Sequence, residues 1–166
     1  MENLKLIVIS LVLMAAVIGG LVWFKGGEKP VANIGNVFAG ELTATENFYD
    51  FGSAKIDGGL ISHEYAVENK TDKSVKINGV STSCMCTSAE VKIGDKTYGP
   101  FGMPGHGGSS AYANIAVNPG EKIIVKATFD PAAHGPAGIG MVERQIFIDT
   151  GAAKPLILNF KVIVTP

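Results

Sequence analysis

The two cysteines of this chain, Cys84 and Cys86, are the residues best suited to chemistry, because they stand two positions apart in the stretch Ser83-Cys84-Met85-Cys86-Thr87. In an extended segment both side chains point to the same face, with Cα atoms roughly 6.6 Å apart at about 3.3 Å per residue. This separation is at the outer limit of disulfide geometry, about 4.4–6.8 Å. Two parallel thiolates therefore suit a single soft metal ion better than an unstrained disulfide.

Further metal ligands are expected from two glycine-rich stretches. The first, Gly94 to Ser110, contains a methionine and a histidine, and the second, Asp130 to Gly140, contains another histidine. Copper(I) accepts thiolate, thioether and imidazole ligands, whereas zinc accepts cysteine and histidine but not methionine. Met85 alternates to the face opposite the cysteines if the stretch is a regular strand. The candidate metal ligands are Cys84, Cys86, Met103, His106 and His134.

Two other interpretations of the cysteines stay open. Both can be small core residues, with Met103 and His106 in a loop that has no metal-binding role. The strained pair can also take part in thiol–disulfide exchange. That idea lacks the helix N-terminus that usually lowers the pKa of a reactive thiol.

The composition limits the classes of function. A formal net charge of −1 and a pI near 6.3 give no basic excess of the kind that binds nucleic acid. The chain contains no Gly-x-Ser-x-Gly elbow and no His-Glu-x-x-His helix, and we therefore expect no enzymatic activity. With 21 glycines, 8 prolines and 46% hydrophobic residues, short apolar strands separated by turns are expected.

The first 24 residues are expected to anchor the protein in a membrane. The stretch from Leu6 to Phe24 has no charged residue and would span roughly 28 Å as a helix, against a hydrocarbon core of about 30 Å. It is too long for the apolar part of a signal peptide and has no good cleavage site nearby. We expect an uncleaved anchor over residues 1–24, a linker over 25–46 and an extracytoplasmic domain over 47–166.

The domain from residue 47 onward has the pattern of an all-β protein. Residues 123–129 and 156–164 alternate between apolar and other side chains, and Asn118-Pro119-Gly120-Glu121 has the sequence of a β-turn. The parity of the strand near Val75 changes at Gly79, which indicates a bulge. His63 is expected to be half-buried and hydrogen-bonded. About seven short strands predict an immunoglobulin-like β-sandwich, preceded by one N-terminal transmembrane helix.

The domain resembles the bacterial family named Domain of Unknown Function 1573. The resemblance runs from roughly Phe48 to Val164 and rests mainly on the Ser-Cys-x-Cys-Thr stretch at residues 83–87, with Tyr49-Asp50-Phe51-Gly52 and Pro119-Gly120-Glu121 in support. It implies an Ig-like fold on exported or anchored proteins, and it implies no activity. This chain differs from the family pattern at Met85, where such proteins usually have glycine.

Two hypotheses of function follow. In the first, the protein is a membrane-anchored binding or scaffolding module whose partner is another extracytoplasmic protein. In the second, it binds a soft metal, copper(I), through the Cys-x-Cys pair and Met or His residues of nearby loops. Metal analysis and a thiol count separate the two hypotheses.

Overall fold

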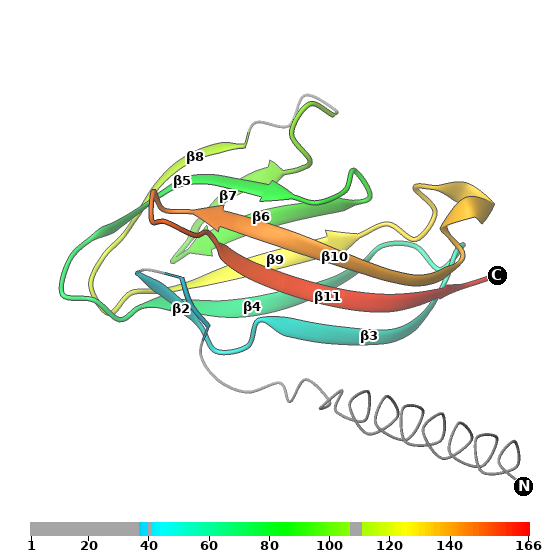
Figure 1. Cartoon of the computed structure of the whole chain (residues 1–166), viewed down its shortest axis with the longest axis horizontal. Coiled ribbons are helices and arrows are strands. Elements are labelled where there is room, and N and C mark those ends of the chain that lie inside the picture. Colours follow the sequence, from blue (N-terminus) through cyan, green and yellow to red (C-terminus); the bar gives the residue numbers. More distant parts are fainter. Residues whose placement is uncertain (1–36, 40, 107–110) are drawn as a thin grey trace, which may run out of the picture. The chain divides into compact units, whose positions relative to one another are not determined.

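The computed structural model describes residues 37–39, 41–106 and 111–166. Over these residues the chain forms two β-sheets packed face to face, and its one helical segment there is the short 3-10 turn Gly135–Gly138 (Figure 1). The predicted all-β sandwich is therefore confirmed. None of the described helices is long and apolar enough to span a bilayer; the expected anchor over residues 1–24 lies outside the described residues.

Neighbouring strands of the six-stranded sheet are antiparallel. One of them, β6 (Thr87–Ile93), begins directly after the two cysteines. In spatial order its strands are β1 (Val37–Ala39), β2 (Leu42–Ala44), β4 (Ile61–Asn69), β9 (Lys122–Phe129), β6 (Thr87–Ile93) and β7 (Lys96–Phe101).

The five-stranded sheet is mixed, because its first strand runs parallel to its neighbour. In spatial order its strands are β3 (Phe48–Lys55), β11 (Leu156–Thr165), β10 (Gly140–Asp149), β5 (Val75–Thr82) and β8 (Tyr112–Val117). The long strands β10 and β11, orange and red in Figure 1, lie side by side and pair over most of their length.

The core lies between the sheets and is built by the alternation that the sequence predicts. In β9 every second residue is buried, namely Ile123, Val125, Ala127 and Phe129. In β11 the same pattern buries Leu156, Leu158, Phe160, Val162 and Val164. Because successive side chains of a strand point to opposite faces, each strand buries one row against the other sheet.

Two local predictions are confirmed by the backbone. The pairing of β5 with β8 shifts register between Ile77 and Gly79, as expected for a bulge. A Cβ atom at Gly79 would lie 2.8 Å from the carbonyl oxygen of Ala111, so the close approach of the two strands needs glycine there. The turn after β8 has Gly120 at φ +73°, and its Glu121 N–H donates to the carbonyl oxygen of Asn118.

The structure has more strands than the seven expected. The glycine-rich stretch Gly94 to Ser110, expected to supply ligands from a loop, contains β7, which pairs with β6. The linker expected over 25–46 contains β1 and β2, and Leu42 and Ala44 of β2 are fully buried. Three-residue strands are too short to show alternation, and Gly99 and Pro100 in β7 have the composition of a turn. The sandwich therefore begins before Asn47.

Candidate metal site

The two cysteines lie in a tight turn that carries the chain from one sheet to the other. The strand β5 of the five-stranded sheet ends at Thr82, and β6 of the six-stranded sheet begins at Thr87. The Thr87 N–H donates to the carbonyl oxygen of Cys84 at 3.1 Å. The extended conformation considered for this stretch is therefore wrong, because the chain must reverse within a few residues to change sheets.

The side chain of Thr82 holds this turn. The Thr82 hydroxyl oxygen lies 3.0 Å from the carbonyl oxygens of both Cys84 and Thr87, and its hydroxyl group can donate to either. Both threonines are buried. A buried hydroxyl group that donates to the carbonyl oxygens of a turn stabilises that turn, because buried backbone carbonyl groups need hydrogen-bond partners.

The turn brings the sulfur atoms of the two cysteines together. Both cysteines are free, and their Sγ atoms are 2.8 Å apart. The backbone N–H of Cys86 also points at the Cys84 sulfur, at 3.5 Å. Cys86 is buried, with 3% of its surface exposed, whereas Cys84 is partly open to solvent. The pair thus has one accessible and one enclosed sulfur.

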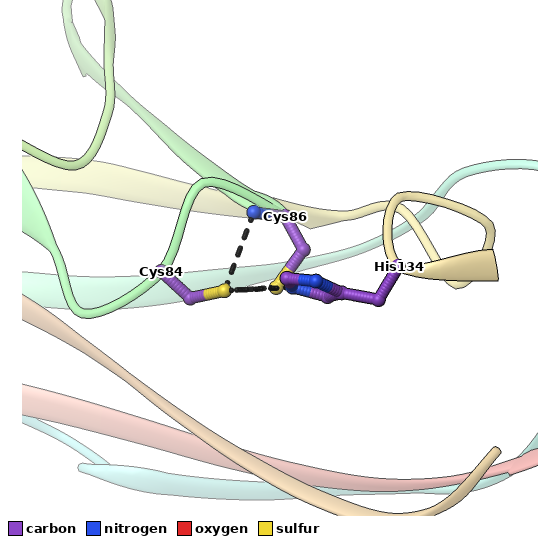
Figure 2. A group of neighbouring side chains, drawn as sticks. All are labelled: Cys84, Cys86 and His134. Atoms are coloured by element: carbon purple, nitrogen blue, oxygen red, sulfur yellow. Dashed lines mark hydrogen bonds between the residues drawn. The ribbon is translucent and has the colours of Figure 1, made fainter. Parts of the chain in front are cut away.

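His134 completes a group of three ligand side chains. Its Nε2 atom lies 3.1 Å from the Cys84 sulfur, and the three ligand atoms lie within 4.8 Å of one another. Figure 2 shows the three side chains pointing toward a common centre. No fourth Cys, His, Asp or Glu joins this group in the described part of the chain.

The loop that carries His134 is attached to the cysteine turn by its own backbone. It follows β9, and the Asp130 N–H donates to the carbonyl oxygen of Cys86 at 2.9 Å. The Asp130 carboxylate then accepts from the Ala132 N–H at 2.8 Å, and Gly135, at φ +56°, begins the short 3-10 turn. These contacts fix where the loop starts, so His134 returns over the sulfurs.

Arg144 is a neighbour of the site that the sequence analysis missed. Its Nε donates to the Cys86 sulfur at 3.2 Å, and its Nη1 donates to the Glu143 carbonyl oxygen at 2.8 Å. In β10 it shares the inward parity of Val142 and Ile146, which are buried. A charged residue on the apolar face of a strand was the available signal, since such a charge needs a partner.

The environment shifts the pKa values of the two thiols in opposite directions. Burial opposes ionisation of Cys84, but hydrogen bonds from Cys86 and His134 and the charge of Arg144 outweigh it and lower the pKa of Cys84 to about 7. Burial raises the pKa of Cys86, and the hydrogen bond from Arg144 opposes that rise. Near neutral pH, Cys84 is therefore the sulfur that ionises first.

Alkylation is expected to select Cys84 and to follow its ionisation. Because the thiolate is the nucleophile, the rate for Cys84 should rise about tenfold between pH 6 and pH 8 and level off above, with a midpoint near 7. Cys86 should react far more slowly because it is buried. Peptide mass spectrometry after timed iodoacetamide pulses measures both rates. A Cys84 rate still rising steeply at pH 9 would contradict the low pKa.

The structure divides the five sequence-predicted ligands between two places. Cys84, Cys86 and His134 come together, whereas Met103 and His106 line a separate hollow beside Met85. His63, expected to be structural, stacks on Tyr49 with ring centroids 3.6 Å apart and bonds to Glu46 at 2.7 Å. That prediction is confirmed.

The fold and this site define the class of protein: an immunoglobulin-like β-sandwich that carries a dithiol and an imidazole on one connecting turn and loop. Residues 42–98 match the model of a family described as a protein of unknown function (DUF1573). The matched stretch contains the cysteine turn and supports the family expected from the sequence, over a shorter range than expected. No curated protein matches the chain.

Solved structures show the same fold at low sequence identity. A protein of unknown function from Porphyromonas gingivalis W83 is 15% identical, with a TM-score of 0.52 over 76% of this chain and 49% of that one. A family 123 glycoside hydrolase from Clostridium perfringens is 6% identical, with a TM-score of 0.51 over 73% of this chain and 23% of that one. A PapD-like domain of human CEP192 is 13% identical, with a TM-score of 0.44 over 84% and 98%. This chain spans about half the length of the first of these proteins. The first two comparisons concern the fold alone, and the TM-score of the third is too low to carry an argument.

Proposed function

We propose that this protein is a soft-metal-binding module in which Cys84, Cys86 and His134 bind copper(I). The observation that supports the proposal is that the three ligand atoms lie within 4.8 Å of one another although the residues come from separate segments. Thiolate sulfur and imidazole nitrogen are ligands that soft ions prefer over hard cations. Two thiolates and one imidazole form a three-ligand site.

The charges around the site favour a monovalent ion. Two thiolates and one copper(I) ion carry a net charge of −1, which the guanidinium group of Arg144 beside Cys86 can neutralise. With zinc(II) the two thiolates are already neutralised, and the partly buried Arg144 would remain as an unpaired positive charge. Structural zinc sites also take four protein ligands almost always, and three come together here among the described residues.

The position of the site suits exchange of the ion with a partner. Cys84 is partly open to solvent and His134 is exposed, whereas Cys86 is enclosed. An incoming ligand can therefore reach the ion from the side of Cys84 and His134 while Cys86 holds it. The binding module expected from the sequence then has a definite cargo, and its partner is another protein that supplies or accepts copper(I).

The proposal places the domain outside the cytoplasm, held to the membrane by residues 1–24. It is supported by the uncharged run from Leu6 to Phe24, which is long enough to cross a bilayer. N-terminal sequencing of the mature protein should find the chain uncleaved. A mature terminus between Gly26 and Glu41 would show that the run is a signal peptide.

Competition against a chromophoric copper(I) chelator tests the metal-binding function. The full-length protein, purified anaerobically in detergent with both thiols reduced, should withdraw copper(I) from the chelator to a single tight equivalent. Zinc(II) in excess should displace little of it, for the reason of charge given above. A protein that withdraws no copper(I) while both thiols are free would leave only the scaffolding function.

A further inference from the structure

A second group of soft ligands lies beside the cysteine turn and is not part of the site described above. Met85, at the tip of that turn, is 58% exposed, so its side chain is open to solvent. It borders a hollow of about 240 Å³ that neither cysteine lines. The residues lining this hollow are Met85, Thr87, Ser88, Pro100, Phe101, Gly102, Met103 and His106.

The loop after β7 brings a methionine and a histidine to the hollow together. The His106 N–H donates to the carbonyl oxygen of Met103 at 3.2 Å, so the two residues close a single turn. The base of this loop is held against the cysteine segment, because Thr82 donates its N–H to the carbonyl oxygen of Gly102 at 3.2 Å. The neighbouring Phe101 is 5% exposed and anchors the loop in the core.

The chemistry of the hollow suits a soft monovalent ion. It offers two thioether groups and one imidazole, and none of its eight lining residues carries a carboxylate. Uncharged sulfur and nitrogen ligands without an anionic group favour copper(I) or silver(I) over hard divalent cations. They also bind more weakly than thiolates, because no ligand charge attracts the ion.

We propose that Met85, Met103 and His106 form a second, weaker soft-metal site that receives copper(I) and passes it to Cys84 and Cys86. The transfer rests on the proposed function of the cysteine site, whereas binding at the hollow does not. Met85 stands between the two cysteines in the chain, so a movement of one turn carries the ion from thioether to thiolate ligands. The second ligand set is accessible and weak, and the first is partly enclosed and strong, which gives the transfer its direction.

Methionine methyl groups report directly on binding at this site. Silver(I), a soft monovalent ion that does not change oxidation state here, is titrated into the full-length C84S/C86S variant labelled with ¹³C at the methionine methyl groups. The Met85 and Met103 signals, assigned with Met→Leu variants, should shift together and saturate at one equivalent. Met141, which is 72% exposed on β10 and outside the hollow, is the matched control and should not shift.

Two comparisons separate this inference from the function of the cysteine site. In the M85L/M103L/H106A variant the shifts should vanish, and loading of copper(I) onto the intact cysteine pair should slow while the final affinity stays unchanged. Methyl signals that do not move in C84S/C86S, or Met141 moving as much as Met85, would overturn the second site. Equal copper(I) affinity of C84S/C86S and wild type would instead overturn the cysteine site and leave the hollow as the sole binder.

Discussion

Replacing Cys84 or Cys86 with serine is expected to lower the affinity for copper(I) by on the order of a thousandfold or more. Loss of a residue that only hydrogen-bonds to a metal ligand already lowers metal affinity about 10–100-fold, and the loss of a ligand should cost more. Serine is nearly isosteric, but its hydroxyl group stays protonated at neutral pH and is a hard ligand. The substitution thus removes both a charge and a soft donor from a three-ligand site. Competition with the chromophoric chelator measures the change.

Replacing His134 tests the imidazole ligand, and the same replacement at His63 is its control. His134→Ala should weaken copper(I) binding less than either cysteine variant, because a neutral ligand is removed and the thiolates remain. His63→Ala removes a histidine of the same type from a stack with Tyr49, away from the sulfurs, and should leave copper(I) affinity unchanged. Serine variants that keep the wild-type affinity, or a His63 variant that loses it, would contradict the assignment of ligands.

The sandwich could be predicted from the sequence where its strands are long and half-buried. The alternation in residues 123–129 and 156–164 corresponds directly to the buried rows of β9 and β11. The parity change at Gly79 located a real bulge. Short strands escaped detection, because Leu42–Ala44 is buried along its whole length and shows no alternation.

The candidate site was only partly predictable, for reasons of distance along the chain. The Cys-x-Cys spacing identified the sulfurs, but it does not reveal the turn after Thr82. The chain turns there because β5 and β6 belong to different sheets, and this depends on their pairing with strands that lie far away in the sequence. His134 lies fifty positions from Cys84 in the chain, and the sequence favoured His106 as the imidazole ligand, with His134 as the alternative. The hydrogen bond from the Asp130 N–H to the Cys86 carbonyl oxygen holds the loop of His134, and not that of His106, beside the sulfurs. A hydrogen bond between backbone atoms cannot be inferred from the residue types.

Asn69 is expected to be the most sensitive position for stability, because its side chain joins three segments inside the sandwich. It is fully buried at the end of β4. Its Nδ2 donates to the carbonyl oxygens of Lys73 at 2.7 Å and Val117 at 2.9 Å. Its Oδ1 accepts from the N–H of Thr71 at 3.0 Å and from the Thr71 hydroxyl group at 2.7 Å. All the hydrogen-bonding capacity of the amide is used.

Asn69→Ala should therefore lower the free energy of unfolding by about 2–4 kcal/mol, as expected for buried partners left unpaired. This is a large share of the roughly 5–15 kcal/mol that stabilises a domain. Urea denaturation of the full-length protein, monitored by far-UV circular dichroism, measures the loss of stability. Asn118→Ala, at an exposed asparagine in the turn after β8, is the control and should change stability by less than about 0.5 kcal/mol.

Asn69→Asp gives a sharper test, because it keeps the shape of the side chain and replaces the donating NH₂ with an oxygen. That oxygen would face the carbonyl oxygens of Lys73 and Val117, and burial would further disfavour the charged form, so the pKa of the new carboxyl should rise on folding. A raised pKa costs nothing below the unfolded value of about 3.9 and destabilises progressively above it. The variant should be closest to wild type near pH 4 and lose stability toward pH 8. A destabilisation that is the same at both pH values would show that the amide does not donate to these carbonyl oxygens.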